Sequence, residues 1–158
     1  MKDRTDMTMI DITPPLSGLP DPDTQPEYYE DVTFKRGVAW VIDVILIGLL
    51  CALIAVLTLG LAVLLLPLFA MIGFVYRWTS LAKHSATPGQ RLMSIEFRRS
   101  DGEPLDGATA FLHVTGYVVS VITFPLQLIS IAMMIVTARK QGLTDMILGT
   151  APINSGAR

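Results

Sequence analysis

A run of apolar residues from Gly37 to Leu59 constrains the fold more than any other feature of this sequence. The run has 23 residues, and Asp43 is its only charged member. As an α-helix it is about 35 Å long, which exceeds the roughly 30 Å thickness of a bilayer's hydrocarbon core. The run therefore predicts a transmembrane helix. Cys51, the one cysteine of the chain, lies inside it and is expected to behave as a small apolar side chain.

A second apolar run extends from Gly60 to about Tyr76, and Arg77 follows it. The link between the two runs, around 58–60, is short and uncharged, which predicts a tight antiparallel helical hairpin. Pro67 is expected either to kink the second helix or to mark its start.

The third apolar region runs from Ala108 to Ala138 and carries no charged residue other than His113. Its 31 residues make a helix of about 46 Å, longer than one span requires. Two readings stay open: one long span, or a hairpin broken near Pro125 with arms of about 15 residues each. The predicted fold class is an all-α integral membrane protein. Its small helix bundle has three spans, or two spans plus a broken or re-entrant hairpin, with a short cytoplasmic β-like loop.

That loop is the polar stretch 80–107. Ile95 and Phe97 alternate with polar residues in it, and Asp101-Gly102 is a turn signal. The pattern predicts a short strand or hairpin near the membrane surface.

The charges divide the chain into a tail and a membrane domain. Residues 1–31 hold eight of the fourteen acids and five prolines, and the rest holds six acids and ten bases. We expect 1–33 to be a disordered acidic tail, 34–151 to form the membrane domain and 152–158 to be a flexible C-terminus. Lys and Arg flank the first helix at its start and the second at its end, but not the turn between them. The positive-inside rule then predicts a multi-pass protein of the bacterial inner membrane with a cytoplasmic N-terminus.

Asp43 is the most informative single residue, because a carboxylate in a spanning helix costs about 2.5–3.5 kcal/mol and usually has a partner or a function. Arg36 precedes it by seven residues on the same helical face. Asp145, in the apolar segment after Arg139 and Lys140, is predicted to reach Arg36 if the C-terminus is cytoplasmic. A structural ion pair and a transport or proton role remain the two interpretations of these charges.

Three further residues have candidate roles. Arg77 lies between Tyr76 and Trp78, which favours an interfacial anchor; the other interpretation makes it the partner of Asp43. Arg91 is predicted to contact lipid headgroup phosphates. His113 has no second His or Cys nearby, which argues against a metal site. No phosphate-binding loop, nucleophile–base arrangement or nucleic-acid motif is present, so we expect no cofactor, no enzymatic activity and no nucleic-acid partner.

Three segments together resemble the RDD family of small bacterial membrane proteins. They are Arg36-x-x-Ala39-x-x-Ile42-Asp43, Thr87-Pro88-Gly89-x-Arg91-Leu92 and Arg139-x-Gln141-x-Leu143-x-Asp145-x-x-x-Gly149-Thr150. The resemblance spans about 33–151. It implies that Arg36, Asp43 and Asp145 are the family's Arg and two Asp, and that the protein is transport-related, with links to sodium/proton antiport. Thr144 stands where many relatives carry His, which weakens a proton relay in that segment.

Two functional hypotheses follow. In the first, the protein moves a small cation or exchanges it for protons at Asp43, while Arg36 and Asp145 gate or tune the site. Because three or four helices are few for a transport pathway, this hypothesis also requires a homo-oligomer or a membrane-protein partner. In the second, the protein is a non-transporting scaffold or assembly factor whose buried charges are structural.

Overall fold

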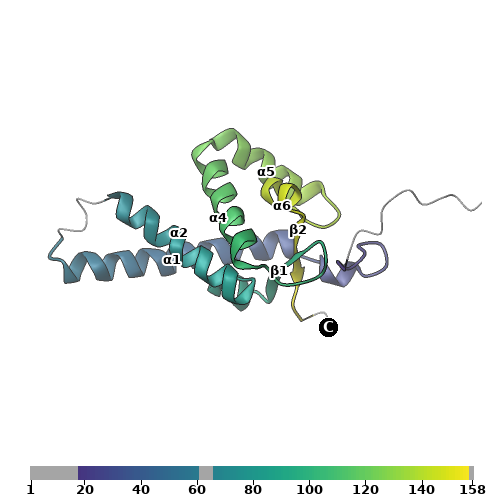
Figure 1. Ribbon diagram of the computed structural model, residues 1–158, viewed down its shortest axis with the longest axis horizontal. Helices are drawn as coiled ribbons and strands as arrows, with labels where there is room; N and C mark the ends of the chain where they lie inside the picture. Colours follow the sequence, from purple (N-terminus) through teal and green to yellow (C-terminus); the bar gives the residue numbers. More distant parts are fainter. Residues whose placement is uncertain (1–17, 61–65, 157–158) are drawn as a thin grey trace, which may run out of the picture.

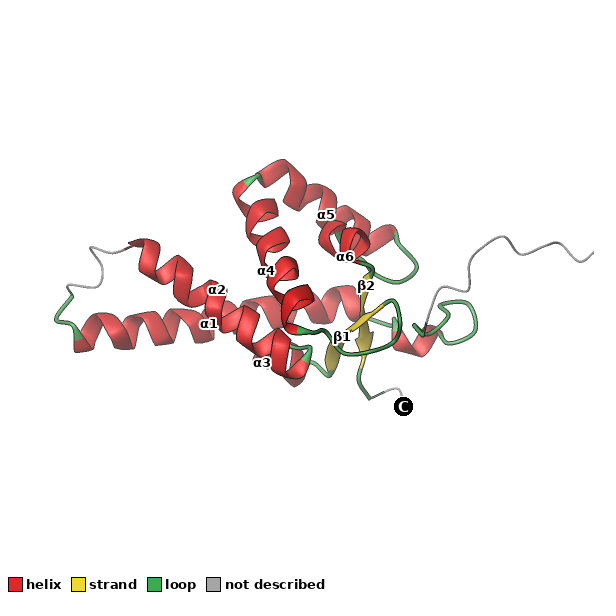
Figure 2. Cartoon of the chain, viewed as in Figure 1, coloured by secondary structure: helices red, strands yellow, loops and turns green. Residues whose placement is uncertain are grey.

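The structure is a computed structural model, and it describes residues 18–60 and 66–156. Residues 1–17 of the predicted tail lie outside the described residues. In chain order the described elements are η1 (Pro26–Tyr28), α1 (Val32–Leu57), α2 (Leu66–His84), α3 (Pro88–Leu92), β1 (Ile95–Arg99), α4 (Gly107–Ile122), α5 (Phe124–Val136), α6 (Leu143–Leu148) and β2 (Thr150–Asn154). Figure 2 shows long helices with one small sheet.

Helix α1 contains the apolar run that the sequence predicts to cross a membrane. Among the described residues it lies in the one continuous helical segment that is long and apolar enough to do so, and the most apolar window of that segment has a mean hydropathy of 2.8. Only 6% of that segment's most apolar window is buried inside the protein. A core helix of a water-soluble domain would be covered, so this helix needs another apolar environment.

Helix α2 returns along α1 and then crosses to α4 (Figure 1). Pro67 is its second residue, a position where proline favours a helix start because its missing N–H has no intrahelical partner. Pro67 therefore lies in the first described turn of α2. Leu81 of α2, Phe97 of β1 and Val114 of α4 are buried together in the main apolar core.

The third apolar region is broken, as the hairpin reading predicts. Helices α4 and α5 meet at Thr123 and are bent by 117° (Figure 1). Their lengths are 16 and 13 residues. The Ser120 hydroxyl donates a hydrogen bond of 2.7 Å to the Gln127 side chain and ties the two arms together. Pro125 is in the first turn of α5, where it favours a new helix rather than continuation of α4.

Strand β1 confirms the strand expected in the 80–107 segment, with Ile95 and Phe97 buried. Its partner comes from the far end of the chain: β2 pairs antiparallel with it, with Phe97 opposite Pro152. The expectation of a flexible C-terminus at 152–158 is therefore wrong for 152–154. These residues are buried because β2 lies between β1 and the N-terminal segment.

The end of the predicted tail is also ordered, which corrects the expectation of disorder over residues 18–33. The Tyr29 ring packs on Ala151 and Ile153, and its hydroxyl donates to the Pro20 carbonyl. The Asn154 side-chain amide donates to two backbone carbonyls of this segment, those of Glu27 and Glu30. The acidic composition does not reveal this anchor, because its contacts are made by a few apolar and aromatic side chains, Leu19, Tyr28 and Tyr29, and by backbone groups.

Candidate functional site

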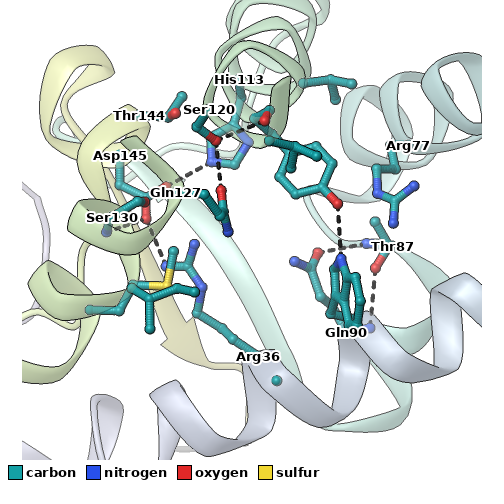
Figure 3. Close-up of a pocket in the computed structure, with 18 of the residues that line it drawn as sticks. Arg36, Arg77, Thr87, Gln90, His113, Ser120, Gln127, Ser130, Thr144 and Asp145 are labelled. Carbon is teal, nitrogen blue, oxygen red and sulfur yellow. Dashed lines mark hydrogen bonds and ion pairs between the residues drawn. The ribbon is translucent and has the colours of Figure 1, made fainter. Parts of the chain in front are cut away.

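A cavity of about 550 Å³ lies between α1, α4, α5 and α6. Figure 3 shows two polar groups of residues facing each other across it. Arg36, His113 and Asp145 lie on one side; Arg77, Thr87 and Gln90 lie on the other. Apolar side chains such as Leu81, Phe97 and Phe124 complete the lining. The volume is in the range of cavities that hold small molecules.

The first polar group is a buried charge cluster of Arg36, His113 and Asp145. The Arg36 guanidinium donates to Asp145 Oδ2 at 2.7 Å, and His113 Nε2 lies 2.7 Å from Asp145 Oδ1. Since an ionised carboxylate only accepts hydrogen bonds, Nε2 is the protonated nitrogen of the imidazole. The Phe97 ring packs against both Arg36 and His113. The structure thus brings Arg36 and Asp145 together, as the sequence predicts.

Helix α6 supplies further hydrogen bonds to the same carboxylate. The Gly142 N–H donates to Asp145 Oδ2 at 2.8 Å and caps the start of α6. Burial raises the pKa of Asp145, but the Arg36 guanidinium, the His113 hydrogen bond and the Gly142 amide outweigh it and hold the pKa below its ordinary value. Asp145 is therefore ionised and paired at neutral pH.

Asp43 lies elsewhere on α1 and has neutral partners. Its Oδ1 accepts from the Tyr76 hydroxyl and the Gly89 N–H, each at 2.9 Å, and its Oδ2 accepts from the Thr87 hydroxyl at 2.5 Å. Asp43 is 3% exposed. In the described part of the chain, no Lys or Arg nitrogen lies within 4.0 Å of its carboxylate. Among the described residues, the hydrogen-bond partners of the Asp43 carboxylate are thus neutral groups.

The short helix α3 is built to meet Asp43. Thr87 caps it in a capping box with Gln90, and Pro88 is in its first turn. A Cβ at Gly89 would lie 2.3 Å from the Ala39 carbonyl oxygen and 2.9 Å from Asp43 Oδ1. Glycine therefore lets α3 approach α1 closely enough to donate to the carboxylate.

Arg77 and Arg91 do not pair with Asp43. The Arg77 guanidinium lies over the Tyr117 ring at 5.1 Å, and Tyr117 in turn accepts a hydrogen bond from the Trp40 indole. Arg91 is exposed on α3. The alternative that made Arg77 the partner of Asp43 is therefore wrong, because Tyr76, Thr87 and Gly89 occupy that place.

Sequence reasoning missed His113 and the hydroxyl partners of Asp43. The absence of a second His or Cys argues only against a metal site at His113, although a lone histidine in an apolar stretch also indicates a buried polar partner. Thr87 and Gly89 belong to the polar stretch 80–107, and nothing local in the sequence indicates that they lie against α1. In the parts of the chain that the structure describes, no group of three His, Cys, Asp or Glu side chains is arranged to hold a metal ion.

A long apolar helix without a protein cover and polar side chains gathered around an internal cavity define a helical membrane protein. The model of the RDD family matches residues 32–149, and the chain belongs to this family. No curated protein and no solved structure matches the chain significantly. The family match covers the first two motifs on which the resemblance rests and the third as far as Gly149.

Proposed function

We propose that this RDD protein is transport-related and that Asp43 binds the small cation or proton that it moves. The observation that carries the proposal is the buried carboxylate of Asp43, which lines the cavity with neutral hydrogen-bond donors only. A buried charge without a counterion is costly in an apolar medium. Uptake of a proton or a small cation removes that cost.

Asp43 also has room for such a ligand. Two carboxylate oxygens offer about four lone-pair directions, and three donors use three of them. The remaining direction and the neighbouring Thr87 oxygen supply hard oxygen ligands, which suit a small cation.

Arg36 and Asp145 have a supporting role in this proposal. They were expected to gate or tune the site, but their mutual pairing leaves little free charge to change during transport. We assign them to anchoring α6 and β2 against α1.

The proposal places the protein in the bacterial inner membrane as a multi-pass protein, with the N-terminus, the sheet and α3 on the cytoplasmic side. The distribution of Lys and Arg in the sequence supports this orientation. One cavity between so few helices does not form a full path across a bilayer, so the proposal includes assembly into a homo-oligomer. It assigns no catalytic chemistry, cofactor or nucleic-acid partner to the chain.

A flux assay in proteoliposomes with a trapped pH dye tests this function. Sodium or potassium gradients are imposed on wild type, Asp43→Asn and Asp101→Asn, where Asp101 is an exposed acid in a surface turn. We expect a cation-driven pH change in wild type and Asp101→Asn and none in Asp43→Asn. Equal flux in all three proteins, or no flux in folded wild type with either cation, contradicts the proposal.

A second candidate function is a non-transporting scaffold. It is favoured by the fact that each buried carboxylate connects α1 to a later segment: Asp43 binds α3 directly, and Asp145 of α6 binds Arg36. Here the double variant Arg36→Asp/Asp145→Arg is expected to restore protein level and partner assembly that Arg36→Asp alone loses. Restored level without transport in any variant favours the scaffold.

A further inference from the structure

Arg77 is a cation without an anionic partner. Among the described residues no acidic group lies within 4.0 Å of it, and no described side chain or carbonyl accepts a hydrogen bond from it. In the described regions, only Arg139 has a side-chain nitrogen that is fully buried and has no hydrogen-bond partner. Because the Arg77 nitrogens have no partner either, they are not fully buried. The Arg77 guanidinium, which lies over the Tyr117 ring, therefore has N–H groups without an acceptor among the described residues.

A groove of about 390 Å³ extends from Arg77 between α1, α2 and α4. Phe69 and Gly73 line it on α2 at intervals of four residues, about one turn, leading away from Arg77, and Ala70 lies beside them. Val44, Ile47 and Gly48 line it on α1, and Val118 lines it on α4. Arg77 is the only charged residue in this lining and stands at one end of it. The groove thus has a cationic side chain at one end and apolar side chains along the rest of its length.

The sequence around Arg77 favours a position near a membrane interface. Trp78, which follows Arg77, is of the aromatic type that gathers where headgroups meet acyl chains, whereas the Tyr76 hydroxyl donates to Asp43. Two further exposed cations, Lys83 and Arg91, follow in the same part of the chain. The outward-facing neighbours of the groove, including Val44, Met71 and Val75, are exposed and apolar.

From this arrangement we infer that the groove is a binding site for an anionic phospholipid; Arg77 lines both this groove and the cavity that Asp43 lines, so the two sites are neighbours. The headgroup phosphate accepts hydrogen bonds from the planar guanidinium of Arg77, a fork that matches phosphate geometry. One acyl chain lies in the apolar groove. The bilayer is the source of the ligand, because the groove runs between helices whose outer surfaces require lipid. Charge complementarity selects anionic over zwitterionic lipid.

Native mass spectrometry of the full chain in a neutral detergent tests this site. Long-chain phosphatidylglycerol, long-chain phosphatidylcholine and soluble glycerol phosphate are titrated separately. We expect saturable binding of one phosphatidylglycerol, with weaker phosphatidylcholine and no glycerol phosphate binding. Arg77→Gln is expected to weaken phosphatidylglycerol binding about tenfold, which corresponds to the loss of one charge-assisted hydrogen bond. Arg77→Lys keeps the positive charge and is expected to weaken this binding less.

Two controls separate this site from general attraction to basic residues. Arg91→Gln removes a nearby exposed cation and is expected to leave the single high-affinity site intact. In Gly73→Leu the new Cβ meets only ordinary contacts, 3.8 Å from Arg77 Nη1 and from Ile47, so the longer side chain fills the groove. We expect it to abolish phosphatidylglycerol retention while Arg77 is still present.

Several results would overturn the inference. Binding that is equal in wild type, Arg77→Gln and Gly73→Leu would place the lipid elsewhere. Binding of glycerol phosphate as tight as that of the lipid would make the site one for free phosphate. A chain that copurifies as a dimer through this face, and that binds no lipid until the dimer is dissociated, would show that a second copy covers the groove.

Discussion

Asp43 and Asp145 are chemically identical, and their surroundings give them different properties. Asp145 meets an Arg36 guanidinium, an imidazole and a backbone amide, so its charge is compensated. Asp43 meets two hydroxyls and an amide, so its charge is solvated without being neutralised. Asp145 is therefore suited to stabilising the fold, and Asp43 is suited to binding a positive ligand.

Removing the partner of Asp145 is expected to destabilise the protein strongly. Arg36 and Asp145 are 12% and 1% exposed, so Arg36→Met leaves an uncompensated buried carboxylate and costs about 3–5 kcal/mol. The matched control is Arg99→Met, because Arg99 pairs with Asp101 and Asp106 at the surface, where water and salt screen the charges and such pairs contribute little to stability. A denaturant titration in mixed micelles measures both free energies of unfolding. Equal small losses would show that the Arg36–Asp145 pair is not a buried anchor.

The same carboxylate predicts an acid dependence of stability. The pKa of Asp145 is lower in the folded protein than its ordinary value of 3.8. The unfolded chain therefore takes up this proton first as the pH falls. The stability it contributes is complete above about pH 5 and is lost as the pH falls through 3.8 toward the folded pKa.

Thermal unfolding of wild type and Asp145→Asn across this range measures that contribution. We expect the melting temperature of wild type to exceed that of Asp145→Asn near neutral pH and the difference to shrink on acidification. Other carboxylates titrate in both proteins and cancel in the comparison. A difference that stays constant down to about pH 3 would contradict the lowered pKa.

At the scale of elements, short segments with tight turns position the site. Helix α3 has five residues and would not be stable alone. Its capping box, Pro88 and the contact of Gly89 with α1 hold it in place. Helix α6 is similarly short, and a Cβ at Gly116 of α4 would lie 2.6 Å from a Thr144 methyl of α6.

Gly89→Ala tests how closely α3 must approach α1. The added Cβ would overlap the Ala39 carbonyl and crowd Asp43, and overpacking of this kind costs about 1–3 kcal/mol. Gly107→Ala is the control, because a Cβ there meets nothing within 4 Å. We expect a lower melting temperature in detergent for Gly89→Ala only. An unchanged Gly89→Ala protein would mean that α3 shifts freely and does not fix Asp43.

Across the whole molecule, the sheet joins segments that the apolar helices separate. Helix α4 begins after β1, and α5 ends before α6 and β2, which pairs with β1. The broken region therefore starts and ends near the same sheet (Figure 1). This arrangement favours a re-entrant hairpin over a single crossing.

Cysteine accessibility tests this topology. In a Cys51→Ala background, Ser100→Cys follows β1 and Ser155→Cys follows β2, and both positions are exposed. We expect an impermeant thiol reagent to label both from the same side of inside-out vesicles and neither from intact cells. Labelling from opposite sides would contradict the paired sheet and establish a single crossing.

The sequence alone determined the apolar helix of 37–59, the alternation in Ile95–Arg99, the break near Pro125 and the family motifs, because each depends on residues a few positions apart. It also indicated the meeting of Arg36 and Asp145, through topology. Only the tertiary structure decided that Thr87 contacts Asp43, 44 residues away. It also decided that β1 pairs with β2 and not within a local hairpin, and that residues 18–31 pack on the C-terminal strand. The physical reason is range: periodicity records which face of an element is buried, whereas the partner of a buried carboxylate depends on how distant elements pack.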